Sequence, residues 1–472
     1  SVYYQTALTG FYYESGKISV DNLVQNLMGA VVKENRDDVQ KLKSYFNTVV
    51  KNRSKEKGGI LGASDTFIDT LKTDIYDWAD TSRGALASDA VRAMALQGGN
   101  LALMTVDAIS KKFNNKMVKR AGEEAFLFAA QQLRIDPEVL GDRIVPNLGF
   151  NNKGEHIIDY GSRSFTATIT PSLQIDLKNA EGKTRKTLPA PGANDDQEKA
   201  SVAKQAFTAM KKNLKSVVSI QNMRLEMALA SNRIWTKEEW EKLFVENPIM
   251  NMFAIGLIWG KYDAKGKLLE SFRYMEDGSF TNVNEDEVKF DSNAAIGLCH
   301  PLDLGDKLIA AWTQQLTDYE IKQPVEQLSR KVFILTEDKK TCTSITEFGG
   351  AVVYAVSLLG KLQKLGWRKG SVQDAGGYSN FYKEYKKQGI GVWLNFSGTY
   401  IGADSEEEVT VYDTVFYKAG TVEYGSYIYD KIEEALVLSE IPPRLYSEIC
   451  YDIERVTANR IKTDENWEKE RE

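Results

Sequence analysis

Hydrophobic residues change their spacing near residue 147, and this change is the strongest constraint on the fold. Before it, apolar residues recur three and four positions apart, as at Val20, Leu23 and Val24, which is typical of amphipathic helices. In residues 164–170 and 173–177 they alternate with polar residues, as in half-buried strands. The chain is therefore expected to contain both helices and sheets.

These patterns predict an α+β protein that is predominantly helical. The short consecutive helices of residues 1–146 suggest paired helices stacked as a HEAT-like solenoid. Asp136 followed by Pro137 is expected to start one of these helices. Residues 147–192 are expected to form a β-hairpin segment followed by a linker rich in Pro, Gly and Asp. Residues 193–346 are predicted to be a mixed central domain, and residues 347–472 a C-terminal α+β region.

Composition limits the compartment and the partners. With 42% hydrophobic residues the 472-residue chain can form a core, and its net charge of −6 disfavours nucleic acid as a partner. The apolar runs 248–260 and 348–360 are shorter than the roughly 20 residues of a membrane span, so we expect buried helices there and no membrane. The scattered Cys299, Cys342 and Cys450 indicate a reducing compartment. We therefore expect a cytoplasmic protein.

The start of the chain indicates a fragment. It begins at Ser1 and shows no signal-peptide pattern. We therefore interpret it as a processed piece or a fragment of a longer protein.

The sequence lacks the signatures of nucleotide, calcium and zinc sites. The glycines of residues 256–260 are separated by three residues, one fewer than in a phosphate loop. The acidic turn 277–288 has its glycine at the wrong position for a calcium loop. With only His156 and His300 as histidines, a histidine-rich metal site is impossible. We expect no cofactor and no metal.

Residues 272–330 contain a dense set of polar side chains, and we predict that Arg273, Asp277, His300, Asp318 and Arg330 converge in space. His300 precedes Pro301 and is expected to cap the helix that begins there. A helix N-terminus disfavours the imidazolium, so His300 would stay neutral. Catalytic candidates are His300, Asp318 and Asp277, and binding candidates are Arg273, Gln323, Gln327 and Arg330.

Two interpretations of this set stay open. In the first, the polar groups line a catalytic site. In the second, His300 only caps a helix while the charged groups form structural ion pairs. Gln327 and Arg330 lie three positions apart on one helix face and could bind a carboxylate or a phosphate. They could equally pair with Asp318 or Glu320.

The same residues resemble a known family, the uncharacterised domain family four-one-three-two of bacterial WGR-domain proteins, which are often called molybdate metabolism regulators. The resemblance extends over about residues 89–456, but Val325 stands where an aromatic residue is expected. Its strongest block comprises Phe272-Arg273, Asp277-Gly278, His300-Pro301, Trp312, Asp318-Tyr319-Glu320, Gln323-Pro324, Gln327 and Arg330. Further matches include Glu226 and Ser447-Glu448.

The resemblance implies a large, multi-domain bacterial protein of the cytoplasm that works with a MoxR-type AAA ATPase and von Willebrand factor A proteins in stress or defence. No catalytic residue of the family can be carried over. We therefore expect a non-enzymatic scaffold or interaction module, with protein partners. One alternative is an enzyme of unknown reaction around His300. The other is a nucleic-acid-linked regulator that acts through a WGR domain absent from this sequence.

Overall fold

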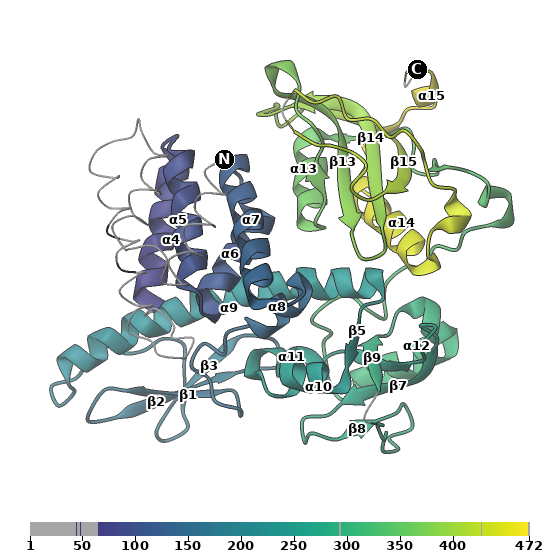
Figure 1. Ribbon diagram of the computed structural model, residues 1–472. Coiled ribbons are helices and arrows are strands. Elements are labelled where there is room, and N and C mark those ends of the chain that lie inside the picture. Colours follow the sequence, from purple (N-terminus) through teal and green to yellow (C-terminus); the bar gives the residue numbers. More distant parts are fainter. Residues whose placement is uncertain (1–43, 45–47, 49–64, 292–293, 426, 471–472) are drawn as a thin grey trace. The chain divides into compact units, whose positions relative to one another are not determined.

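The structure is a computed structural model (Figure 1), which describes residues 65–291, 294–425 and 427–470 together with Ser44 and Thr48. The chain divides into two compact units, each described here by itself. Unit 1 comprises Ser1–Ile220 and Lys242–Asn251, and unit 2 comprises Gln221–Glu241 and Met252–Glu472. In the described segments, no helix is both long and apolar enough to cross a bilayer.

Unit 1 begins, in its described part, with a group of helices. They are α4 (Asp65–Asp80), α5 (Gly84–Gln97), α6 (Asn100–Lys112), α7 (Lys116–Leu133) and α8 (Pro137–Arg143). The predicted start of α8 is confirmed, since Asp136 accepts the backbone N–H of Glu138 at 2.8 Å and Pro137 is the first helical residue. This helix start depends only on residues a few positions apart, so the local sequence is sufficient to predict it.

The prediction of a predominantly helical chain with a HEAT-like solenoid is wrong. In a solenoid each helix pair contacts only its neighbours in sequence, whereas α7 packs on both α5 and α6, and α4 also contacts both. Three antiparallel sheets follow the helices, so the protein is a mixed α+β fold (Figure 1). The part of the solenoid prediction before residue 65 lies outside the described residues, apart from Ser44 and Thr48.

Within residues 147–192, where a β-hairpin segment and a linker are expected, residues 155–185 form a four-stranded antiparallel sheet. The strands pair in the order β1 (Glu155–Asp159), β2 (Ser164–Ile169), β3 (Ile175–Asn179) and β4 (Thr184–Arg185). Phe165, Ala167 and Ile169 alternate with half-exposed residues on β2 and are buried. The predicted alternation is therefore confirmed on this strand, because one face of the sheet is covered.

The segment between this sheet and α9 (Gln197–Ser231) is tied to the β1–β2 turn through Asp195. This carboxylate accepts hydrogen bonds from the hydroxyl of Ser162, the guanidinium of Arg163 (Nη2 to Oδ2, 2.8 Å) and the backbone N–H of Gly192 (2.7 Å). The Ser162 hydroxyl, the Gly192 amide and Arg163 together lower the pKa of Asp195 to about 2.

Asp195 predicts an acid-dependent loss of stability. Because its folded pKa of about 2 lies below the ordinary 3.8, its contribution is complete above pH 3.8 and is lost as the pH falls through about 2. We expect Asp195→Asn to lower the unfolding midpoint at pH 6, with a difference from wild type that shrinks steadily toward pH 2. Thermal unfolding at several pH values measures this. Asp176→Asn on exposed β3 is the control, and an Asp195→Asn difference that does not vary with pH would contradict the assignment.

Unit 2 contains a five-stranded antiparallel sheet in the order β5-β9-β6-β7-β8. Helix α12 packs against β7 of this sheet, and α10 follows β5. The elements are β5 (Ile234–Thr236), α10 (Lys237–Trp240), β6 (Ile258–Tyr262), β7 (Leu268–Tyr274), β8 (Phe280–Thr281), β9 (Ala295–Leu298) and α12 (Pro301–Asp318). A π-helical turn (Glu241–Val245) and α11 (Pro248–Ile255) connect α10 to β6.

A different cluster of buried side chains packs on each face of this sheet. Trp259 and Phe272 are register partners on β6 and β7, and both rings contact Trp240. Ile258 packs instead in a cluster with Trp312 of α12, whose indole N–H donates to the Ser271 hydroxyl at 2.9 Å. Alternation along β6 and β7 thus separates an aromatic face from the face on which the N-terminus of α12 is held.

The C-terminal part of unit 2 is a seven-stranded antiparallel sheet, covered on one face by α13 and α14 (Figure 1). Its main path is β12-β13-β14-β15-β11-β16, and β10 pairs with β15. The elements are β10 (Ser344–Ile345), β11 (Ala351–Tyr354), α13 (Ala355–Lys364), β12 (Arg368–Lys369), β13 (Gly377–Tyr385), β14 (Ile390–Tyr400), β15 (Glu408–Lys418), α14 (Pro443–Thr457) and β16 (Lys462–Thr463). Short 3-10 turns (Glu337–Lys339, Asp374–Gly376, Leu438–Glu440) and α15 (Trp467–Glu470) complete it.

Candidate functional site

His300 lies at the start of α12 and uses both ring nitrogens. Its Nδ1 accepts the backbone N–H of Leu302 at 3.1 Å, and its Nε2 lies 3.0 Å from the Glu448 carboxylate. Because Nδ1 is an acceptor here, the proton of the neutral ring must be on Nε2, which donates to Glu448. The predicted helix cap is confirmed, and the ring is fully buried.

Asp303 completes the helix start and connects it to α14. Its carboxylate accepts the backbone N–H of His300 at 3.2 Å and the hydroxyl of Tyr262 at 2.9 Å. The same oxygen is bonded by the guanidinium of Arg444, the second residue of α14. Arg444 also donates to the carbonyls of Leu229 and Leu298, at 3.2 and 3.4 Å. The guanidinium thus connects α14 to α9 and β9.

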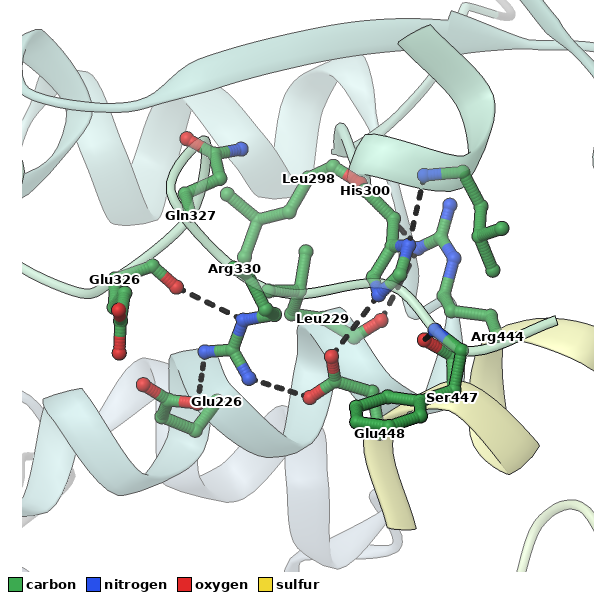
Figure 2. A network of polar contacts seen from close by, with 12 residues as sticks. Glu226, Leu229, Leu298, His300, Glu326, Gln327, Arg330, Arg444, Ser447 and Glu448 are labelled. Carbon is green, nitrogen blue, oxygen red and sulfur yellow. Dashed lines mark hydrogen bonds and ion pairs between the residues drawn. The ribbon is translucent and has the colours of Figure 1, made fainter. Parts of the chain in front are cut away.

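Glu448 lies one helical turn after Arg444 and bridges two predicted residues. One carboxylate oxygen accepts from His300, and the other accepts from Arg330 Nη1 at 2.5 Å. Figure 2 shows His300 and Arg330 on either side of this carboxylate. Their meeting was predicted, but the residue that joins them was not, and we call this set the Glu448 network (Glu226, His300, Asp303, Arg330, Arg444 and Glu448).

Each of the three guanidinium nitrogens of Arg330 donates a hydrogen bond within the protein. It forms an ion pair with Glu226 of α9, and its Nε donates to the backbone carbonyl of Glu326 at 2.9 Å (Figure 2). The ring of Tyr451 lies 5.3 Å from its guanidinium carbon, within range of a cation–π contact. With a side-chain exposure of 0%, Arg330 has no surface left with which to bind a ligand.

Burial and neighbouring charges determine the pKa values of His300, Glu226 and Arg330 in the Glu448 network. Burial lowers the pKa of His300, which keeps the ring neutral. Burial raises the pKa of Glu226. For Arg330, burial acts to lower the pKa, but the carboxylates of Glu448 and Glu226 outweigh it and raise the pKa. A positive charge on His300 would also break the helix cap, since Nδ1 would then be a donor facing the Leu302 N–H.

Gln327 is buried, and its side-chain amide forms the hydrogen bonds that a neighbouring strand backbone would form. Its side-chain oxygen accepts the backbone N–H of Ile258 at 2.9 Å, and its nitrogen donates to the carbonyls of Ile258 and Cys299 at 2.7 and 2.8 Å. The oxygen also accepts from Gln323 at 2.8 Å, and Gln323 accepts the backbone N–H of Leu328. The Gln327 amide therefore completes the ends of β6 and β9, and Gln327 has no bonding capacity left for a ligand.

The prediction that five polar residues converge around His300 is wrong for Arg273, Asp277 and Asp318. Arg273 is buried and donates to Gln315 of α12 at 3.0 Å, beside the ring of Tyr319. Asp277 is exposed and accepts from the hydroxyl and amide of Ser279 within its own turn. Asp318 is exposed at the end of α12 and accepts from Gln314 at 2.7 Å. Asp277 and Asp318 bond to partners within four positions, and Arg273 bonds to Gln315 instead, so none of the three bonds to His300.

Four members of the Glu448 network were not among the predicted site residues, namely Glu226, Asp303, Arg444 and Glu448. Glu226 and Glu448 are among the residues that carry the family resemblance, and that was the available signal. Glu448 is 148 positions from His300, so spacing cannot connect the two. Arg444 follows Pro443, the first residue of α14, and nothing in its local sequence indicates a buried partner.

A pocket with a cavity volume of about 540 Å³ lies within unit 1. It is lined by the Gly98-Gly99 turn before α6, by Arg143 and by Asn147, among others. None of the predicted catalytic or binding residues lines this pocket. Within the described residues, no group of three or more His, Cys, Asp or Glu side chains is arranged to hold a metal ion.

Comparison with known proteins gives a family match for the centre of the chain. Residues 182–367 match the family described as Domain of unknown function (DUF4132). The chain is also 30% identical over 302 residues to the "Uncharacterized protein YehI" of Escherichia coli (strain K12). That alignment covers 64% of this chain and 25% of the relative, so the chain spans about a quarter of the length of the curated relative it matches.

No solved structure matches the chain. His300, Gln327 and Arg330 lie inside the family match, whereas Arg444 and Glu448 lie beyond its end. The two matches therefore support an uncharacterised family, the domain of unknown function DUF4132, as the family that residues 182–367 of this chain resemble.

Proposed function

We propose that this chain is a non-enzymatic scaffold and interaction module of a longer protein, and that the Glu448 network stabilises it. The observation that carries the proposal is the environment of His300. Its ring has no exposed surface, and both nitrogens are bonded within the protein. A general acid or base must reach the proton that it transfers, and this ring has no free nitrogen with which to do so.

The charges of the Glu448 network also support a structural role. Arg330 neutralises Glu448, and Arg444 neutralises Asp303, while Glu226 completes the contacts of Arg330. Buried carboxylates and guanidinium groups that satisfy one another are typical of structural networks. The network joins α9, α12 and α14, which are far apart in sequence.

The proposed partner is a MoxR-type AAA ATPase that acts with von Willebrand factor A proteins in the bacterial cytoplasm, in stress or defence. The support for this part is the family resemblance to WGR-domain and molybdate regulator proteins, together with a relative about four times longer than the matched segment. Size-exclusion chromatography of the full-length protein with that ATPase tests it. We expect co-elution and a changed rate of ATP hydrolysis, and separate elution with unchanged hydrolysis would overturn the partner.

Substitution of His300 tests the non-enzymatic role. We expect His300→Ala to lower the free energy of unfolding by roughly 2–4 kcal/mol, because it removes a helix cap and a hydrogen bond to a charged group. His300→Asn keeps a capping oxygen but loses the donor to Glu448, so it should cost about 1 kcal/mol less. Urea unfolding of the three proteins measures these differences. If His300→Ala leaves stability unchanged and still abolishes cellular function, the enzyme alternative is correct.

A further inference from the structure

An exposed aromatic face surrounds the turn before β13 in unit 2. Its side chains are Tyr400 (57% exposed), Ile401 (53%), Tyr427 (69%) and Tyr429 (86%). Large apolar side chains grouped on the surface mark interaction sites more often than single exposed ones do. We call these four residues the Tyr429 face.

Backbone hydrogen bonds hold Ile401 and Tyr427 to one turn, Tyr400 is the register partner of Gly377, and Tyr429 lies two positions after Tyr427. Ile401 donates its N–H to the carbonyl of Gly376 at 3.0 Å, and Tyr427 donates to the carbonyl of Val372 at 2.9 Å. Gln373 connects the two sides, since its N–H donates to the Gly377 carbonyl at 2.8 Å and its side chain donates to the Ile428 carbonyl. The face is therefore built on ordered backbone, although its segments are distant in sequence.

The charged residues near the Tyr429 face are mainly acidic, although the exposed Lys431 lies two positions after Tyr429. Asp374 lies in the turn itself, and Asp404 and Glu406 lie in the turn that follows Ile401; all three are exposed. None of the three forms a salt bridge with another residue in the described part of the chain. The neighbouring Glu408, by contrast, pairs with Lys462 at 2.9 Å. These three carboxylates, which lie in the turns next to Ile401 and before β13, thus remain available to a cation from outside.

We propose that the Tyr429 face binds a basic peptide segment of a partner protein, one in which Lys or Arg flanks an apolar residue. Exposed tyrosine rings attract ammonium and guanidinium groups through cation–π contacts, the carboxylates add charge complementarity, and Ile401 offers an apolar contact. The same carboxylates repel the phosphates of nucleic acids and anionic lipids. They also disfavour a second copy of this chain as the partner, because the acidic groups of the two copies would repel each other.

This inference rests on the proposed role as an interaction module. Peptide binding and complex formation with the ATPase are measured independently, so either proposal can be overturned without the other. The probe is a fluorescently labelled 12-residue peptide of lysine, arginine and leucine, titrated into the 472-residue chain with anisotropy as readout. We expect binding that weakens with added salt and no binding of a matched peptide with glutamate in place of the basic residues.

Paired variants identify the site. Tyr427→Ser/Tyr429→Ser should weaken binding about fivefold through lost cation–π contacts, and Asp404→Asn/Glu406→Gln should weaken it at least about fivefold and reduce its salt dependence. Asp286→Asn/Glu287→Gln removes the same charge from another exposed acidic turn and should leave binding within about twofold of wild type. All variants should keep the wild-type unfolding midpoint, since the substituted side chains are exposed. Absence of binding, or equal loss in the control variant, would overturn the proposal.

Discussion

Replacement of Glu448 by alanine is expected to lower the free energy of unfolding by about 3–5 kcal/mol. The substitution removes the carboxylate that accepts from both His300 and Arg330. Arg330 keeps its ion pair with Glu226, but its Nη1 loses its partner in a site with no access to water. A buried charge that loses a partner is costly, because neither solvent nor another group replaces the lost interaction.

Glu454→Ala is the matched control on the same helix. Glu454 forms an ion pair with Lys331 on the surface, where both side chains are partly exposed. Exposed ion pairs contribute about 0–1 kcal/mol, so this variant should stay close to wild type. Urea unfolding of both variants gives the comparison, and equal effects would show that Glu448 is not structurally important. The double variant Glu448→Leu/Arg330→Met should recover part of the loss, since apolar pairs often replace buried ion pairs without penalty.

Replacement of Gln327 by leucine is expected to cost roughly 2–6 kcal/mol, because it leaves two buried backbone groups without partners, each worth about 1–3 kcal/mol. These are the N–H of Ile258 and the carbonyl of Cys299. The carbonyl of Ile258 keeps a bond from the N–H of Cys299 at 3.1 Å. Among backbone groups the loss is therefore confined to these two, at the ends of β6 and β9, and the Gln323 side chain also loses its acceptor on Gln327.

Gln314→Leu on α12 is the control for this substitution. Gln314 is exposed and bonds only to the exposed Asp318 among the described residues, so its replacement should change stability by no more than about 0.5 kcal/mol. Guanidinium unfolding measures both variants. If Gln327→Leu unfolds at the wild-type denaturant concentration, its backbone contacts are not needed and Gln327 regains its place as a ligand-binding candidate.

Features that depend on neighbouring residues were predicted correctly. The start of α8 at Asp136-Pro137 and the cap of α12 at His300-Pro301 follow from side chains that bond to backbone groups two or three positions away. The strand β2 follows from alternation within six residues. In each case the group and its partner lie within one turn or one strand, so the local sequence contains both.

Residues 348–360 show where local pattern was insufficient. This apolar run was predicted to be a buried helix, but it forms β11 before α13 begins at Ala355. β11 pairs with β15 and β16, which lie between about 50 and 110 positions later. A short apolar run suits a buried strand and a buried helix alike, so these distant partners decided its conformation.

The candidate site divides in the same way. The sequence by itself determined that His300 caps a helix and stays neutral, because Pro301 and the helix N-terminus are adjacent to it. Only the tertiary structure decided that Glu448 joins His300 to Arg330, while Asp277 and Asp318 remain on the surface. The physical reason is that a buried charge must find a partner wherever the fold places one, whereas an exposed carboxylate is satisfied by water and by its own turn.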